Sequence, residues 1–266
     1  MVTDFFENAA GDISGAEWRR FSRLLSIVDV AYDGLIARYN KVAIVRALMV
    51  PPQKLLLAAI EVPGREKELQ SVVNSISASA VHHVTQSIAP MGQRGKFDNI
   101  NNILARHRLC DFDWILITDD DVALPSNFLD LFLYYCIKNK LKLAMPAHRF
   151  LSHKTFAITE RNCASTVRLT NFVEIGPITI IHRDAFSSLI PFPSLRYAWG
   201  LDVLWSAVAM QQNWTIGIVD ATPIRHLRPI AGTYGGDVAR KEAEAFLDEH
   251  SVTLSRAEIM SKNIRV

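Results

Sequence analysis

Between residues 54 and 139, short apolar runs alternate with amphipathic segments, and this alternation constrains the fold more than any other feature of the chain. The apolar runs predict buried strands at 54–62, 81–89 and 113–118. The segments that follow them predict helices at 66–79, 97–108 and 126–139, the last with Ser126 as its N-cap. Strands and helices at this spacing form βαβ units. The sequence therefore predicts an α/β fold, with a mainly parallel sheet flanked by helices.

The pattern is looser beyond Pro146. Residues 166–189 predict two strands and a short helix, residues 199–212 a helix, and residues 214–226 a final strand. The glycine-rich segment 229–236 predicts a flexible loop that closes over a ligand or lies inert on the surface. A charged helix is expected at 237–250, and we expect the last residues to be disordered.

Residues 14–39 predict an amphipathic helix, because apolar side chains recur there at three- and four-residue steps. The stripe consists of Trp18, Phe21, Leu24, Leu25, Val28, Tyr32, Leu35 and Ile36. Such a stripe predicts a face packed on the core. A helix lying on a membrane surface is the alternative, and the small number of arginines on the polar face argues against it.

The charge balance argues against a nucleic-acid surface, because 29 basic and 27 acidic side chains leave a net charge of only +2. No apolar run approaches the roughly 18 residues that suggest a membrane span, and the acidic N-terminus lacks the features of a signal peptide. The widely spaced Cys110, Cys136 and Cys163 predict reduced thiols rather than a zinc site or disulfides. We therefore expect a cytoplasmic protein without a transmembrane segment, with peripheral membrane contact left open.

Three consecutive carboxylates, Asp119, Asp120 and Asp121, follow the apolar strand predicted at 113–118. Ligands of open α/β sheets bind beyond the carboxyl ends of the strands, which is where this triplet lies. In an extended chain Asp119 and Asp121 point to one side and Asp120 to the other. Carboxylate oxygens suit Mg²⁺ or Mn²⁺, which are often held by one or two carboxylates and by substrate phosphates. The triplet therefore predicts a site for a divalent cation or a phosphate.

Several classes of enzyme place aspartates at the end of a buried strand, and two of them fit this sequence poorly. A P-loop nucleoside triphosphatase also needs GxxxxGK[ST], and the only Gly-Lys pair lies in "RGKF" at 94–97, so we reject this class. A phosphatase of the haloacid dehalogenase type uses DxDx[TV]. Here the fifth position is Ala123 and the motif lies late in the chain, which leaves this class as a weaker alternative.

The segment "GKFDNINNILARHRLCDFDWILITDDDVALP" at 95–125 resembles the segment that GT-A nucleotide-sugar glycosyltransferases of the family-2-like type place across their DxD motif. Downstream, "YAWGLDVLWSAVAMQQNWTIGIVDATPIRH" at 197–226 is similar to their acceptor-side helix, next strand and late histidine. The resemblance implies a single GT-A-like, Rossmann-related domain at 51–240, with a donor half at about 54–125 and an acceptor half at about 145–235. Residues 1–50 would form an N-terminal helical extension, and residues 241–266 a C-terminal helix and tail.

The same resemblance implies roles for individual residues in transfer from a nucleoside diphosphate sugar to an acceptor hydroxyl. Asp121 and His226 would bind Mn²⁺ or Mg²⁺, Asp119 would reach the metal or the ribose, and Asp202 would act as the general base of an inverting reaction. Trp199 and Gly200 would contact the acceptor, which is a sugar, a lipid-linked molecule or a small molecule; Trp205 is expected in the core. The donor-binding candidates are Pro63, Arg65, Lys96, Asn99, Asp119, Asp120, and either Arg225 or Arg228.

The chain also departs from the family pattern. Leu201-Asp202 stands where family-2 enzymes usually have Glu-Asp, and the Gln-x-x-Arg-Trp motif of processive synthases is absent. We therefore expect a non-processive transfer. A catalytically silent module on the same fold, binding a nucleotide sugar or a partner, stays as the alternative because a fold does not fix an activity.

Overall fold

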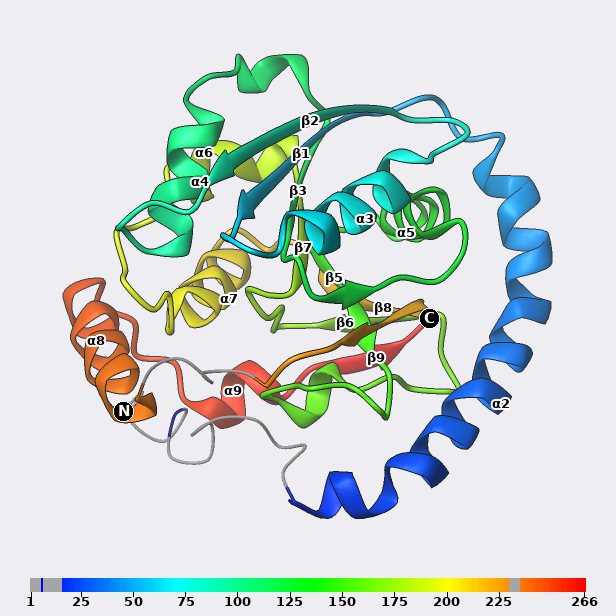
Figure 1. Ribbon diagram of the computed structural model, residues 1–266. Helices are drawn as coiled ribbons and strands as arrows, with labels where there is room; N and C mark the ends of the chain where they lie inside the picture. Colours follow the sequence, from blue (N-terminus) through cyan, green and yellow to red (C-terminus); the bar gives the residue numbers. More distant parts are fainter. Residues whose placement is uncertain (1–5, 7–15, 230–234) are drawn as a thin grey trace.

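The computed structural model describes residue 6 and residues 16–229 and 235–266. In this part of the chain a nine-stranded sheet runs through the molecule in the order β2-β1-β3-β7-β5-β8-β6-β9, and β4 pairs with β8 off this path (Figure 1). The strands are β1 (Lys54–Glu61), β2 (His83–Pro90), β3 (Trp114–Thr118), β4 (Val122–Ala123), β5 (Leu143–His148), β6 (Val167–Thr170), β7 (Ile178–His182), β8 (Ile216–His226) and β9 (Asn263–Arg265).

Most strands of the sheet point in one direction. β1 pairs in parallel with β2 and β3, and β5 pairs in parallel with β8. β7 runs antiparallel between β3 and β5, and β6 runs antiparallel between β8 and β9. The structure thus confirms the predicted α/β fold with a mainly parallel sheet, and the carboxyl ends of β1, β3, β5 and β8 lie at one edge.

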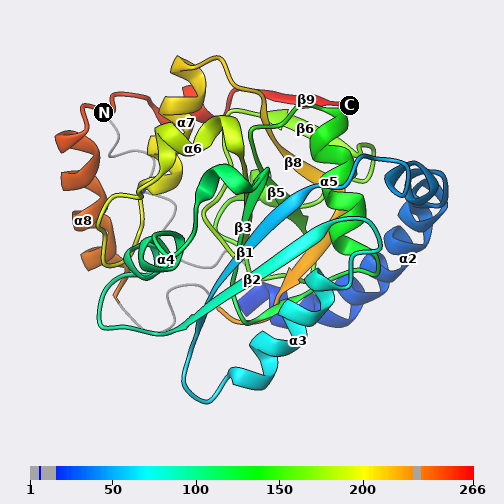
Figure 2. The same ribbon diagram turned by 90° about the horizontal axis from the view of Figure 1, so that it is seen from above.

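Helices cover both faces of the sheet, as Figure 2 shows. The core on one face joins the sheet to α3 and α5, and the core on the other face joins it to α4, α6, α7 and α8. The helices are α2 (Ala16–Ala47), α3 (Glu66–Ser77), α4 (Lys96–Leu104), α5 (Phe128–Lys138), α6 (Phe186–Leu189), α7 (Leu201–Gln211), α8 (Gly236–Glu249) and α9 (Arg256–Met260). Among the described residues, no helix combines the length and the apolar character needed to cross a bilayer.

The N-terminal helix α2 is longer than predicted and packs against α5. The prediction that its apolar stripe packs on the core is wrong in part. Leu25, Val28 and Ile36 are partly buried, but Leu24 and Leu35 of the same stripe are exposed. The stripe therefore divides between the inner and the outer side of the helix.

Three local predictions need correction. Ser126 does not cap α5, because the helix begins after Asn127, whose left-handed backbone (φ 55°) makes the turn. The C-terminal tail is ordered: Ser255 and Glu258 form a capping box that starts α9, and β9 pairs with β6. The strand β5 was not predicted. Most of the predicted loop 229–236 lies outside the described residues.

Candidate functional site

The carboxylate triplet lies beside the end of β8. β4 follows the triplet directly and pairs with the last residues of β8, so that Val122 lies opposite His226. A backbone hydrogen bond from Leu227 to Asp121, 2.9 Å long, extends this pairing to the triplet itself. This pairing holds the triplet next to the end of β8, although the two lie far apart in the sequence. Asp121 and His226 are thereby neighbours, as the prediction requires.

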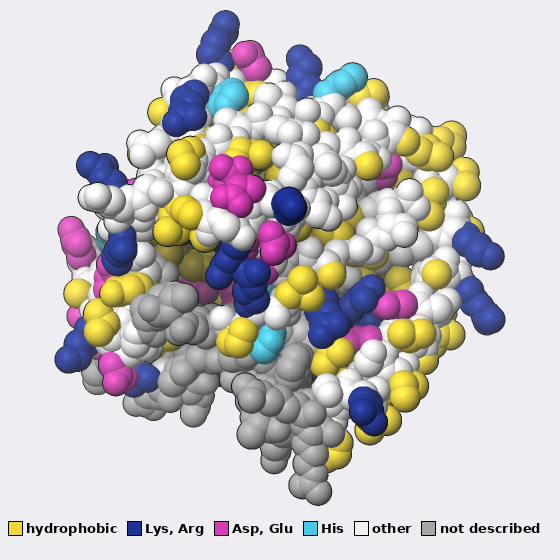
Figure 3. All heavy atoms as spheres, viewed as in Figure 1, with side chains coloured by type: hydrophobic (Ala, Val, Ile, Leu, Met, Phe, Trp, Pro, Cys, Tyr) yellow, Lys and Arg dark blue, Asp and Glu magenta, His cyan; other side chains and the backbone are white. Residues whose placement is uncertain are grey.

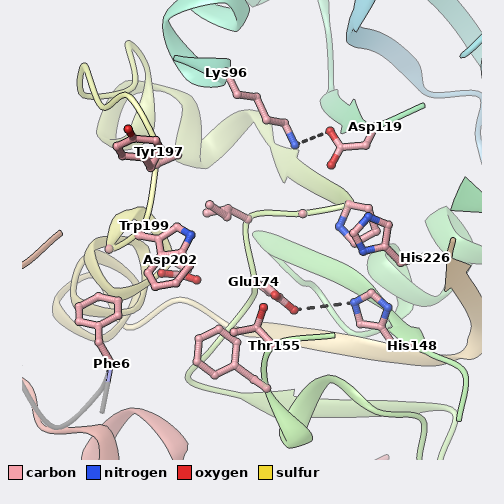
Figure 4. A pocket seen from close by; sticks show the side chains of 16 residues that line it. Phe6, Lys96, Asp119, His148, Thr155, Glu174, Tyr197, Trp199, Asp202 and His226 are labelled. Carbon is pink, nitrogen blue, oxygen red and sulfur yellow. Dashed lines mark ion pairs between the residues drawn. The ribbon is translucent and has the colours of Figure 1, made fainter. Parts of the chain in front are cut away.

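Two adjoining cavities open at this point, with volumes of about 690 and about 180 Å³. The larger is lined by the triplet, by the ends of β1 and β2, and by the loop before α4. The smaller is lined by Trp199, Gly200 and Asp202 from the start of α7 and by His148 and Glu174 (Figure 4). Lys96, Asp119, Tyr197 and His226 line both cavities. On the face seen in Figure 3, acidic and basic side chains lie close together near the centre.

Asp121 and His226 are in direct contact, with 3.2 Å between the carboxylate Oδ1 and the imidazole Nε2. Burial alone raises the pKa of Asp121, but the hydrogen bond and the charge of His226 outweigh it and lower this pKa. Burial alone lowers the pKa of His226, and the hydrogen bond and the charge of Asp121 outweigh it and raise that pKa. The two groups therefore stabilise each other as an ion pair at the wall of the larger cavity.

The other two aspartates each face a cation. Lys96, the first residue of α4, lies 2.6 Å from Asp119, and Arg65 at the start of α3 lies 3.5 Å from Asp120. Burial raises the pKa of Asp120, and the neighbouring charge of Asp121 raises it further. The Oδ2 atom of Asp120 is buried without a hydrogen-bond partner in the described part of the chain.

The loop before α4 brings its backbone against the larger cavity. The buried Asn99 holds this loop by donating from its amide to the carbonyls of Arg94 and Gly95, at 3.2 and 3.0 Å. A Cβ atom on Gly95 would lie 1.9 Å from the backbone oxygen of Leu195, so only glycine fits there. Arg94 and Arg196 line the same cavity together with Arg65 and Lys96. Asn99 lines this cavity, and its amide is used to shape the loop.

Replacing Gly95 by alanine is expected to lower the free energy of unfolding by roughly 1–3 kcal/mol, because the added methyl group overlaps a backbone atom. Chemical denaturation measures this change. Gly34 on α2 is the matched control, since a Cβ there meets nothing within 4 Å. Gly34→Ala should raise the free energy of unfolding by about 0.5–1 kcal/mol. Equal effects of the two substitutions would contradict the close approach at Gly95.

Asp202 lies in the first turn of α7 and is almost fully buried at the smaller cavity. Burial raises the pKa of its carboxyl to about 8, and the charge of the nearby Glu174 raises it as well. The helix begins at Gly200, whose backbone (φ 89°) is of the kind that glycine adopts without strain. Trp199 stacks on Phe6, with 6.3 Å between the ring centroids, and gives this cavity an aromatic wall. A carboxyl that ionises near neutral pH is suited to accept a proton.

Sequence reasoning missed His148 and Glu174, which line the smaller cavity. His148 Nε2 lies 3.7 Å from Glu174 Oε2, and the rings of His148 and His226 lie 6.3 Å apart. Ser152 accepts from the backbone of His226 and hydrogen-bonds His148 at 3.0 Å. His148 lies at the carboxyl end of β5, where ligands of such sheets bind, but no strand was predicted there and no signal in the sequence marked this residue.

Not every predicted residue reaches the two cavities. Pro63 is exposed on the loop after β1, next to Val62, which does line the larger cavity. Arg225 is not among the lining residues, and Arg228 lies 4.0 Å from Glu68 on the side of α3. Trp205 is buried against Phe97 in the core, as expected.

Asp121 and His226 are the residues at the triplet that would hold a divalent cation, together with oxygen atoms of a bound ligand. Among the described residues, no group of three or more His, Cys, Asp or Glu side chains is arranged to hold a metal ion. Asp121 and His226 offer an oxygen and a nitrogen side by side, and Asp119 is turned to Lys96. Mg²⁺ is commonly bound by one or two carboxylates together with substrate phosphates. This donor set is therefore incomplete alone and suitable once phosphate oxygens are added.

No protein-family model matches this chain, and no curated protein matches it by sequence. Solved structures do match by fold. S. aureus TarS in complex with UDP-GlcNAc matches with a TM-score of 0.51 and 10% identity, over 66% of this chain and 59% of that chain. The chain therefore shares the fold of the matched part of TarS. A second structure of S. aureus TarS matches with a TM-score of 0.50 and 10% identity, over 65% of this chain and 60% of that chain. This chain spans about three fifths of the length of those chains, and the likeness concerns the fold alone.

Proposed function

We propose that this chain transfers a sugar from a nucleoside diphosphate sugar to an acceptor hydroxyl. The observation that carries the proposal is the pair of joined cavities, one with the acid triplet and four cationic side chains, the other with Asp202. A volume of about 690 Å³ lies within the usual range for a small-molecule site. A nucleotide-sugar donor is supported by this charge pattern and by the UDP-GlcNAc held by the TarS structure of similar fold.

The cationic side chains of the larger cavity would bind the diphosphate. Lys96 stands between the two cavities and already pairs with a carboxylate, Asp119, so it is placed to donate to an anion at the reacting bond. Asp121 and His226 would hold a Mn²⁺ or Mg²⁺ ion. When bound, such an ion supplies positive charge that lowers the cost of the leaving diphosphate.

Asp202 would remove the proton from the acceptor hydroxyl as that oxygen bonds to the anomeric carbon and the bond to the diphosphate breaks. Attack from the face opposite the diphosphate inverts the anomeric carbon. Trp199 forms an apolar wall against which a sugar ring can stack, next to Asp202. We propose a non-processive transfer, since the sequence lacks the motif of processive synthases.

A thermal-shift screen of nucleotide sugars, with Mn²⁺ and with a chelator, tests the proposal. A donor at a hundred times its Kd raises the free energy of unfolding by about 2.7 kcal/mol. For a chain of this size that corresponds to roughly 5–10 °C in Tm. Hits are then assayed for release of the nucleoside diphosphate with candidate acceptors. If no nucleotide sugar raises the Tm with Mn²⁺ present, the proposal fails; binding without transfer would favour the silent module.

Lys96→Ala is expected to weaken binding of the donor roughly ten- to hundredfold, because it removes a charge-assisted hydrogen bond to the diphosphate. Calorimetric titration measures the change in Kd. Lys142→Ala is the matched control: Lys142 also pairs with an aspartate, Asp184, but lines neither of the two cavities. Equal Kd values for the Lys96 and Lys142 variants would contradict the role of Lys96.

A further inference from the structure

The helix α2 is docked to the domain through polar groups. The buried Asp29 accepts hydrogen bonds from the backbone nitrogens of Phe150 and Leu151, at 3.0 and 2.8 Å. It also pairs with the buried Arg161 at 3.1 Å. Buried carboxylates need such partners, and here they fix the N-terminal half of the helix to the loop after β5.

The second half of α2 is docked in the same way. The buried Asn40 donates to the carbonyl of Ala221 at 2.9 Å and accepts from the hydroxyl of Tyr135 at 3.2 Å. Only small residues, Ala43 and Ala47, are fully buried on the last turns of this inner face. An amphipathic helix of a globular protein usually turns its apolar stripe to the core. On α2 these polar contacts stand beside apolar ones, in which Tyr32 packs on Phe150 and Ala43 and Ile44 join the core.

The outer face of α2 and of the turn after it carries large apolar side chains. Their exposed fractions lie between 49% and 79%. They follow one another at steps close to whole helical turns and so form one stripe, which consists of Leu24, Ile27, Leu35, Val42, Val45 and Met49. Figure 1 places α2 along one flank of the molecule, and Figure 3 shows apolar and basic side chains along that flank. A contiguous exposed apolar surface of this kind marks an interaction site.

The charges on the same face have one sign. Arg23, Arg38, Lys41 and Arg46 are exposed. Between residues 21 and 49 the only carboxylates are Asp29 and Asp33. Asp29 is buried, and Asp33 pairs with Arg149 and Arg161 of the domain at 3.0 and 2.9 Å. The outer face of this segment therefore presents apolar and cationic side chains together, with no acidic side chain among them.

We propose that α2 binds the surface of a membrane that contains anionic lipids, with its apolar stripe in the interface and its cations at the lipid phosphates. From sequence, the small number of arginines on the polar face argued against a membrane-surface helix. In the structure four exposed cations accompany the apolar stripe, and helices that combine an apolar face with Lys and Arg lie in the plane of a bilayer. A second copy of the chain fits the stripe less well, because it presents the same cations to it. This membrane binding does not depend on the proposed sugar transfer, and the proposed transfer does not require it.

Co-sedimentation with lipid vesicles tests this proposal. The full chain should sediment with vesicles of phosphatidylcholine and phosphatidylglycerol and much less with vesicles of phosphatidylcholine alone, and added salt should weaken the binding. The double variant Arg38→Glu with Lys41→Glu should weaken it roughly thirtyfold or more. Val42→Glu with Val45→Glu should weaken it roughly a hundredfold, because two apolar side chains no longer enter the interface.

Val238→Glu is the matched control, because Val238 is 56% exposed on α8, far from α2 in both ribbon views (Figures 1 and 2). It should bind vesicles like the unchanged chain. All the altered side chains are exposed, and unchanged circular dichroism and Tm verify that the variants fold. The proposal is overturned if the unchanged chain does not sediment with anionic vesicles, or if Val42→Glu with Val45→Glu leaves the binding unaltered. A third result would also overturn the proposal: the unchanged chain is a dimer that binds no vesicles, and Val42→Glu with Val45→Glu converts it to a monomer.

Discussion

Replacing Asp202 by asparagine is expected to reduce sugar transfer roughly a hundredfold to ten-thousandfold while leaving donor binding nearly unchanged. The loss follows from removal of the group that accepts the acceptor proton, and it has the usual size of general-base catalysis. Donor binding is preserved because Asp202 lines only the smaller cavity, and the cations for the diphosphate line the larger one. The rate of nucleoside diphosphate release and the Kd of the donor give the two quantities separately.

The same substitution should stabilise the folded protein. The Asp202 pKa of about 8 lies above the 3.8 of an ordinary aspartate, so the folded state keeps a proton that the unfolded chain releases. The stability of the unchanged protein therefore falls as the pH rises from about 4 to about 8 and is constant above that. The amide of the Asp202→Asn variant does not titrate, so this variant does not lose stability in that way. A shift of one pKa unit corresponds to about 1.4 kcal/mol. At neutral pH the free energy of unfolding of the variant should therefore exceed that of the unchanged protein by a few kcal/mol.

The pH dependence of kcat/KM provides a second readout for Asp202. An essential base with a pKa of about 8 should make the rate rise about tenfold per pH unit below that value and level off above it. Glu174→Gln should move this rise to lower pH, because the charge of Glu174 helps to raise the Asp202 pKa. Near-normal turnover of Asp202→Asn, or a rate that is flat across the neutral range, would remove Asp202 as the base.

Replacing Asp121 by asparagine is expected to abolish the dependence of donor binding on Mn²⁺ or Mg²⁺. Mutation of a residue that only orients a metal ligand typically lowers metal affinity or activity about ten- to hundredfold. Loss of the ligand itself should therefore lower the metal affinity roughly a hundredfold or more. The carboxylate also holds His226, so its loss disturbs the second proposed ligand as well. Donor Kd values measured with Mn²⁺ and with a chelator should become equal in this variant.

Asp111→Asn is the control for that experiment. Asp111 lies before β3 instead of after it, and its exposed ion pair with Arg108 contributes little to stability. This variant should keep the full effect of Mn²⁺ on the donor Kd. If the unchanged protein binds the donor equally well with and without metal, Asp121 and His226 serve only as an ion pair.

β1 and β3 were predictable from sequence because their apolar runs are buried on both faces and bounded by clear breaks. β5 escaped detection because Pro146 interrupts it, and proline argues against a central strand. The structure accommodates Pro146 by a shift of register against β8 between Pro146 and His148. The capping box of Ser255 and Glu258 was readable in the sequence and would have predicted α9.

The candidate site was predictable where its residues follow strands. The family resemblance paired Asp121 with His226 as metal ligands, which stays a prediction, and in the structure β4 brings the two residues together through its register with β8. Glu174 lies on the connection between β6 and β7, and its approach to Asp202 is a tertiary contact that no spacing in the sequence indicates. Likewise, α2 carries apolar residues on two sides, and the sequence alone cannot say which side meets the domain.

Calorimetric titration with nucleoside diphosphates tests most directly whether the acid triplet and its cations form a donor site. We expect at least one nucleoside diphosphate to bind the unchanged protein in the presence of Mn²⁺. We also expect this binding to weaken strongly on chelation and in the Asp121→Asn variant. Failure of every nucleoside diphosphate to bind the folded protein with Mn²⁺ present would contradict the account.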